Sequence, residues 1–115
     1  MAKIKQDFDL FAGEDKDIKF TITDEDGAAV DLTTGVTELI WVCARLASDQ
    51  QNLIVKRKDS GIAFATNVIT VSLTFTDTDQ LSGKYRHELR MVKDGAESVL
   101  AIGQCQVYNS LTKSL

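Results

Sequence analysis

The sequence predicts an all-β protein, a β-sandwich of about seven short strands in a single domain over residues 1–115. Apolar and polar residues alternate with period two along most of the chain, and no window shows the 3.6-residue apolar repeat of an amphipathic helix. Turn signals rich in Asp and Gly separate the alternating stretches. A chain of this length is sufficient for one hydrophobic core, so we expect no second domain.

Two stretches carry the clearest alternation. Residues 18–22 run apolar, polar, apolar and end at the acidic turn of residues 24–27, and residues 69–75 repeat the pattern. Between them, residues 38–47 are apolar on both faces and are expected to be central in a sheet. Residues 52–59 carry more charge, which favours a position nearer an edge.

Three further strands complete the set. Residues 84–92 and 98–109 are joined by a turn at Lys93-Asp94-Gly95, whose Asp-Gly pair is a strong hairpin signal. An N-terminal strand is expected at about residues 4–11, with one face formed by Ile4, Phe8 and Leu10. This strand is a possible assembly strand, because it can either complete its own sheet or add to the edge of a neighbour.

The stretch TDTDQLSGKYRHEL (residues 76–89) predicts a corner between two strands rather than an active site. The hydroxyl and carboxylate side chains of residues 76–78 are suited to cap one helical turn over residues 79–81. We expect Leu81 to enter the core and Gly83 to adopt a positive φ. The hydroxyl of Tyr85 should then bond back to an upstream backbone group, as in the tyrosine corner of Greek-key sandwiches.

We expect no catalytic, cofactor or metal site. His87 shares its strand face with apolar side chains, and no nucleophile motif or phosphate-binding glycine loop occurs in the chain. The acidic turn at residues 24–27 lacks the ligand spacing of a calcium loop, which leaves a loosely held Ca²⁺ as the minor alternative. Cys43 and Cys105 are interpreted as buried free thiols, with a disulfide as the second reading.

Charge is distributed unevenly. Residues 7–38 hold ten acidic and two basic side chains, whereas residues 39–115 hold seven acidic and nine basic ones. This pattern is typical of solvated turns, and it also suits acidic and basic surfaces that align copies or neighbours in an assembly. We expect no nucleic-acid binding, since the one basic cluster, Lys56–Lys58, has no flanking aromatic residues. We expect no membrane span and no signal peptide, hence synthesis in the cytoplasm.

The order of the turn motifs resembles that of a small immunoglobulin-like domain found in virion proteins of tailed phages and prophages, as in the N-terminal domain of phage baseplate upper proteins. The resemblance covers about residues 12–109, and its matching positions are Asp26-Gly27, Asp31-Leu32-Thr33 with Gly35, Asp77-Thr78, Leu81-Ser82-Gly83-Lys84-Tyr85 and Gly103. It implies an immunoglobulin-like Greek-key β-sandwich with a structural role in the virion and without catalytic residues. The chain ends with the domain, without a fibre or receptor-binding extension, which favours an accessory subunit of the tail, baseplate or head-tail region.

We therefore expect a non-enzymatic phage or prophage virion protein that is made in the bacterial host cytoplasm. Its expected partners are other virion subunits, and itself as a homo-oligomer; no cofactor is expected. The alternative is a small ligand- or carbohydrate-binding module. That alternative is favoured only if Trp41, Tyr85 or Tyr108 lines an exposed groove.

Overall fold

The structure is a computed structural model, and it describes residues 3–45 and 52–111. The described chain is nearly all β, which confirms the predicted fold class. Its strands are β1 (Ile4–Lys5), β2 (Phe8–Phe11), β3 (Lys16–Thr21), β4 (Val36–Arg45), β5 (Asn52–Lys58), β6 (Gly61–Ala65), β7 (Val68–Leu73), β8 (Gly83–Lys93) and β9 (Ala96–Tyr108), and its one helix is α1 (Phe75–Thr78).

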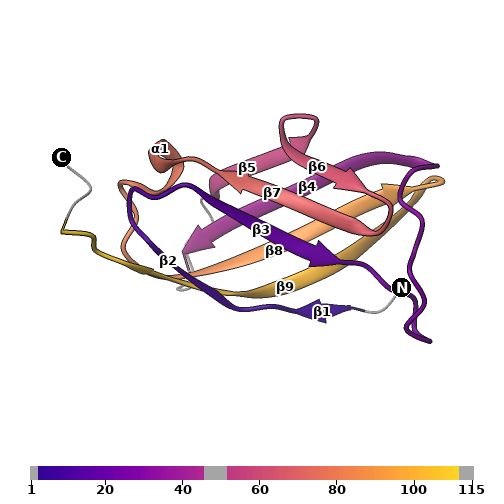
Figure 1. Cartoon of the computed structure of the whole chain (residues 1–115), viewed down its shortest axis with the longest axis horizontal. Helices are drawn as coiled ribbons and strands as arrows, with labels where there is room; N and C mark the ends of the chain where they lie inside the picture. Colours follow the sequence, from indigo (N-terminus) through magenta and orange to yellow (C-terminus); the bar gives the residue numbers. More distant parts are fainter. Residues whose placement is uncertain (1–2, 46–51, 112–115) are drawn as a thin grey trace.

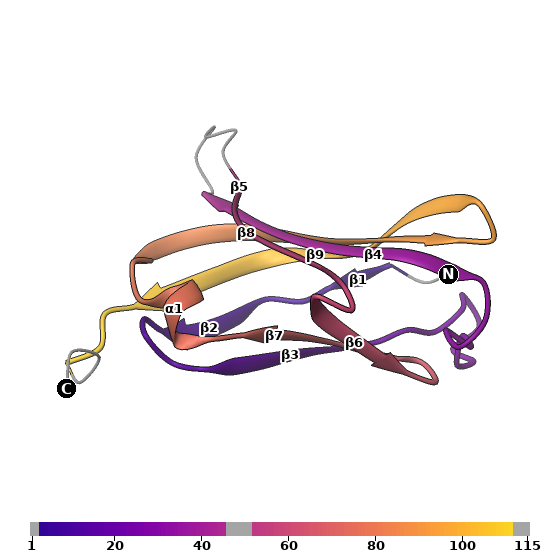
Figure 2. The same ribbon diagram turned by 90° about the horizontal axis from the view of Figure 1, so that it is seen from above.

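The strands form one mixed sheet that curls into two packed layers (Figures 1 and 2). The hydrogen-bonded order is β1-β9-β8-β4-β5-β6-β7-β3, and β2 also pairs with β9. Seen from above, β9, β8, β4 and β5 form one layer and β6, β7 and β3 form the other (Figure 2). The sheet passes from one layer to the other between β5 and β6, which pair over only two residues each. Asp59, which lies between these two strands, has a positive φ of 63°. The two layers make the fold sandwich-like.

The described residues contain nine strands instead of about seven. The predicted N-terminal strand is divided at Gln6 and Asp7 into β1 and β2. The second addition is β6, which the sequence did not reveal because its five residues, GIAFA, include Gly and two Ala with weak strand preference. Pairing with β7 over four residues holds this segment extended.

The core lies between the two layers and follows the predicted alternation. Ile18 and Phe20 of β3 belong to the same buried cluster as Trp41 of β4 and Leu89 of β8. The largest fully buried side chains are Trp41, Tyr85, Phe20, Ile22, Leu32, Leu39, Ile69, Leu89, Met91 and Leu100. Only two buried residues are polar in the described chain, Thr78 and His87.

The helical turn begins four residues earlier than predicted. The sequence indicated residues 79–81, whereas α1 spans Phe75–Thr78. The carboxylate of Asp77 accepts a hydrogen bond of 2.8 Å from the backbone N–H of Thr74, which places the start of the helix at Thr74. Phe75, expected to continue the buried face of the preceding strand, instead lies on the helix and is 56% exposed.

Candidate interaction surface

The corner brings its three predicted residues together. The hydroxyl of Tyr85 donates to the carbonyl of Ser82 and accepts from its backbone N–H, both at 2.8 Å. Gly83 has φ of +92°, a conformation that a side chain disfavours, and Leu81 is half-buried against the core. Because Tyr85 is itself buried, these contacts hold the end of the turn against the start of β8.

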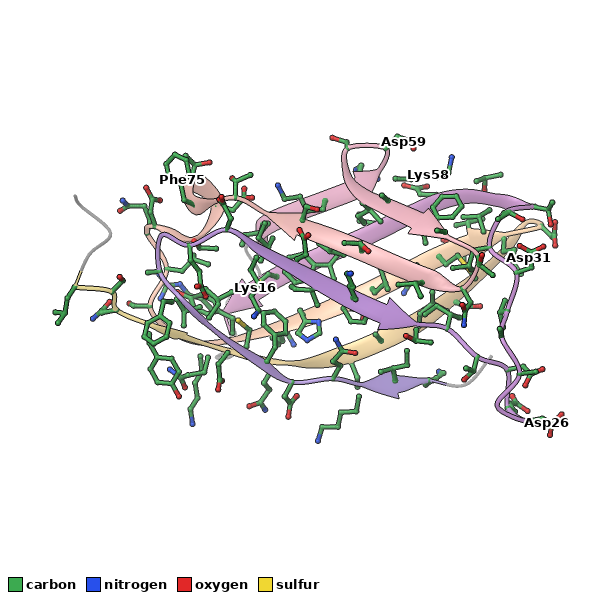
Figure 3. The ribbon with its side chains drawn as sticks, viewed as in Figure 1. Lys16, Asp26, Asp31, Lys58, Asp59 and Phe75 are labelled. Carbon is green, nitrogen blue, oxygen red and sulfur yellow. The ribbon has the colours of Figure 1, made fainter. Side chains whose placement is uncertain are left out.

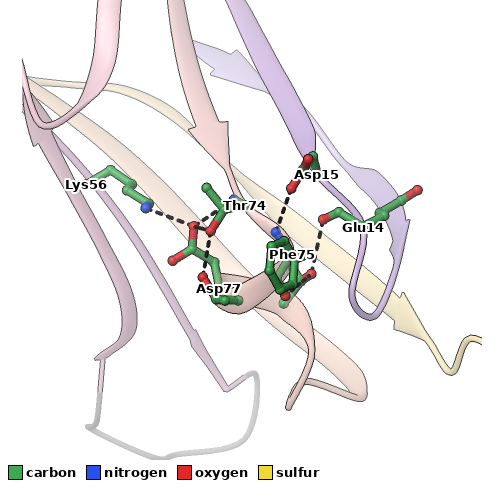
Figure 4. Close-up of polar contacts among 8 residues, drawn as sticks. Glu14, Asp15, Lys56, Thr74, Phe75 and Asp77 are labelled. Carbon is green, nitrogen blue, oxygen red and sulfur yellow. Dashed lines mark hydrogen bonds and ion pairs between the residues drawn. The ribbon is translucent and has the colours of Figure 1, made fainter. Parts of the chain in front are cut away.

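Helix α1 joins the two layers at this end of the molecule (Figure 4). Lys56 of β5 contacts the carboxylate of Asp77 at 2.8 Å, and Asp15, just before β3, accepts the backbone N–H of Phe75 at 2.7 Å. The hydrogen bonds from Lys56 and Thr74 lower the pKa of Asp77, although partial burial acts in the opposite direction. These contacts hold α1 to both layers, which suits a structural role for the helix.

The N-terminal strand completes the sheet of its own chain. β1 and β2 run parallel to β9, with Ile4 opposite Ala101 and Leu10 opposite Val107. Leu10 is buried, and Ile4 and Phe8 are half-buried against the core. Of the two roles considered for this strand, the described chain therefore adopts the intramolecular one.

Gln6 and Asp7 separate β1 from β2, and their own side chains bond to the backbone of neighbouring strands. The amide of Gln6 donates to the carbonyl of Lys19 in β3 at 3.0 Å, so it spans the opening between the first strands and the last strand of the sheet. The carboxylate of Asp7 accepts the backbone N–H of Gln104 at 2.9 Å, in place of a strand carbonyl. A side chain at Gly103 would collide with the Gln6 carbonyl, since its Cβ would lie 2.0 Å from that oxygen.

His87 connects this junction to the core. Its Nε2 lies 2.7 Å from the carbonyl oxygen of Gln6, and its Nδ1 lies 3.3 Å from the indole nitrogen of Trp41. A carbonyl only accepts and an indole N–H only donates, so this geometry requires the neutral imidazole with its proton on Nε2. Burial lowers the pKa of His87 below its ordinary value of 6.5, although the Gln6 hydrogen bond and the Asp7 charge act in the opposite direction.

The outward side of the β9-β8-β4-β5 layer carries apolar side chains at positions that face solvent. We call this surface the open face. One row across it consists of Val55, Val42, Glu88, Ile102 and Lys5, each opposite the next on neighbouring strands. Val55 is 45% exposed and Ile102 is 51% exposed. The solvated face of such a sheet is ordinarily polar, so exposed apolar residues here indicate a surface suited to a contact.

A shallow hollow of about 590 Å³ lies on the open face, over the backbone of His87 and Gly103. Lys5 and Arg86 border it, together with Glu88. No ion pair within the described residues engages Lys5, Arg86 or Arg90, whereas Arg57 at the margin of the open face is bound to Glu38 at 2.6 Å. At the border of the hollow, the two cations Lys5 and Arg86 stand against the one carboxylate of Glu88, which gives this border a positive balance.

An acidic loop projects from one end of the molecule, where Figure 3 shows Asp26 at its tip. The Asp24 carboxylate accepts the backbone N–H groups of Asp26 and Ala28, both at 2.9 Å, and so shapes the turn. Glu25 and Asp26 are exposed and make no ion pair within the described part of the chain. The loop therefore presents two carboxylates on a preformed turn.

The predicted binding aromatics do not form a groove. Trp41 is fully buried and Tyr85 nearly so, which removes two of the three residues on which a carbohydrate site was to depend. Tyr108 is exposed beside Phe11, with ring centroids 5.8 Å apart. Of the three aromatic residues that the ligand-binding alternative requires to be exposed, Tyr108 is exposed and the other two are buried.

The two thiols and the acidic side chains do not form a reactive or metal-binding site within the described residues. Cys43 and Cys105 are free and buried, and burial raises the pKa of each thiol to about 12. Over residues 3–45 and 52–111, no group of three His, Cys, Asp or Glu side chains is placed to hold a metal ion. Within the same ranges, no helix is long and apolar enough to cross a membrane.

No protein family matches the chain, and no curated protein is significantly similar to it in sequence. The features of the surface that sequence reasoning missed are the Gln6 and Asp7 junction and the open face. A glycine inside a strand, as at Gly103, is a known sign of close backbone approach and was the one available signal for the junction. The open face had no such signal, because its members come from five different strands.

Proposed function

We propose that this chain is a structural subunit of a phage or prophage virion, of the tail, baseplate or head-tail region, which acts by contacting other proteins. The observation that carries the proposal is the open face, where exposed Val55 and Ile102 stand among unpaired cations on a sandwich-like scaffold. Such a mixture of exposed apolar side chains and charged groups is found at protein interfaces.

Two further features support the proposal. The sandwich-like fold and the Leu81, Gly83 and Tyr85 corner agree with the resemblance to small immunoglobulin-like virion domains. The first and last strands are held together by Gln6, Asp7 and His87, which gives a rigid body of the kind that repeated assembly requires.

The test is to purify particles produced from the genome that encodes this chain and to analyse their proteins by mass spectrometry. We expect the chain in the particle fraction at a fixed ratio to other particle proteins, retained after density-gradient centrifugation. Its absence from intact particles would contradict the proposal. A pull-down with the products of flanking genes then identifies the subunit that it contacts.

A further inference from the structure

We propose that the open face of one copy binds the acidic loop of a second copy, so that the chain assembles head to tail. This inference rests on the proposed function, because it names the partner that the open face takes in a structural subunit. It joins two surfaces of the described chain that have no partner within one molecule.

Charge complementarity is the first argument. The border of the hollow on the open face presents Lys5 and Arg86 against the carboxylate of Glu88, and Arg90 follows two positions along β8, whereas the loop presents Glu25 and Asp26. Groups of opposite sign that meet across an interface favour correct register and faster association. Neither set is neutralised by an ion pair within the described residues, so both stay available to another molecule.

The shape and polarity of the two surfaces also agree. After its carboxylates, the loop exposes the small apolar residues Ala28 and Ala29, which suit a shallow hollow bordered by Ile102 and Val42. The loop needs little ordering on binding, because Asp24 already fixes its turn through two backbone hydrogen bonds.

The geometry makes the contact heterologous. The loop lies at one end of the longest axis, which measures 43 Å, while the open face lies along the broad side of one layer. Two different surfaces therefore meet, and a heterologous contact closes into a ring or continues as a filament.

Charge reversal on each surface tests the contact by sedimentation velocity at low ionic strength. The face variant carries Arg86→Glu and Arg90→Glu, and the loop variant carries Glu25→Lys and Asp26→Lys. We expect the unmodified chain to self-associate, weakening as salt is raised, and each variant alone to associate at least about tenfold more weakly. An equimolar mixture of the two variants should associate again, because each open face then meets a loop of opposite charge.

The matched control carries Lys19→Glu, Ala63→Glu and Ala65→Glu, which give the same change in net charge at exposed positions of the opposite layer. This control should associate like the unmodified chain. A chain that stays monomeric at low salt, variants that associate normally, or a mixture that fails to associate would each overturn the inference. A monomeric chain that is nevertheless found in purified particles would overturn head-to-tail docking alone and leave the proposed function intact.

Discussion

The indole N–H of Trp41 donates to Nδ1 of His87 over 3.3 Å in the centre of the core. A proton added to Nδ1 would face this N–H group and remove the acceptor, so the packed state requires neutral His87. The imidazole thereby joins the middle of β4 to the Gln6 junction through its two nitrogens.

We expect the free energy of unfolding to fall as the pH is lowered through about 6.5. The pKa of His87 is lowered in the folded state, so the unfolded chain binds a proton first; the stabilisation is complete above 6.5 and is lost as pH falls toward the folded pKa. Urea denaturation of the native chain and of His87→Gln at several pH values measures this. An equal pH dependence in both chains would show that another group titrates.

Gly103→Ala should destabilise the fold by roughly 1–3 kcal/mol, because the new Cβ would overlap the carbonyl of Gln6. Hydrogen exchange should show faster exchange at residues 4–11, since the first strands must move away from β9. Ser72→Ala, at an exposed position of β7, is the control and should leave both measurements nearly unchanged. Unaltered exchange in the Gly103 variant would mean that the junction adapts without release of the strands.

Tyr85→Phe should cost about 1 kcal/mol of stability, because it leaves the N–H and the carbonyl of Ser82 without their partner. Tyr108→Phe provides a matched control, since the Tyr108 side chain is exposed and its hydroxyl makes no hydrogen bond within the described residues. Thermal unfolding of both variants gives the comparison. Equal midpoints would remove the argument that the tyrosine hydroxyl stabilises the corner.

Both thiols should resist a thiol-specific reagent in the native protein. Cys43 and Cys105 are buried with pKa values raised to about 12, so almost no thiolate is present at neutral pH. In denaturant, without reductant, two thiols per chain should react. A mass lower by two hydrogens, with no reactive thiols in denaturant, would instead demonstrate a disulfide.

The sequence predicted what depends on local pattern. Alternation placed Trp41, Tyr85, His87 and Leu89 on buried faces, and turn chemistry located the corner. It misplaced the helical turn because Asp77 caps an earlier turn, at Thr74, where several neighbouring hydroxyl and carboxylate side chains offered competing caps.

The remaining features depend on which strands become neighbours. The sequences of β1, β2 and β9, taken separately, do not indicate that these strands pair in parallel. The row from Val55 to Lys5 is equally invisible in the sequence, because its residues come from five strands. The short strand β6 was missed for a related reason, since tertiary pairing rather than intrinsic preference keeps it extended. The candidate surface therefore becomes visible only with the register of the sheet.

The pairing of the first strands with the last has a consequence for biosynthesis. Asp7 and Gln104, which are hydrogen-bonded, are separated by 97 positions, so β1 and β2 leave the ribosome long before β9 exists. Closing so large a loop carries a high entropic cost, and we expect docking of the N-terminal segment to be the last folding step. A nascent chain stalled before residue 96 would hold β1 and β2 unpaired with β9, where proteases and chaperones can reach them.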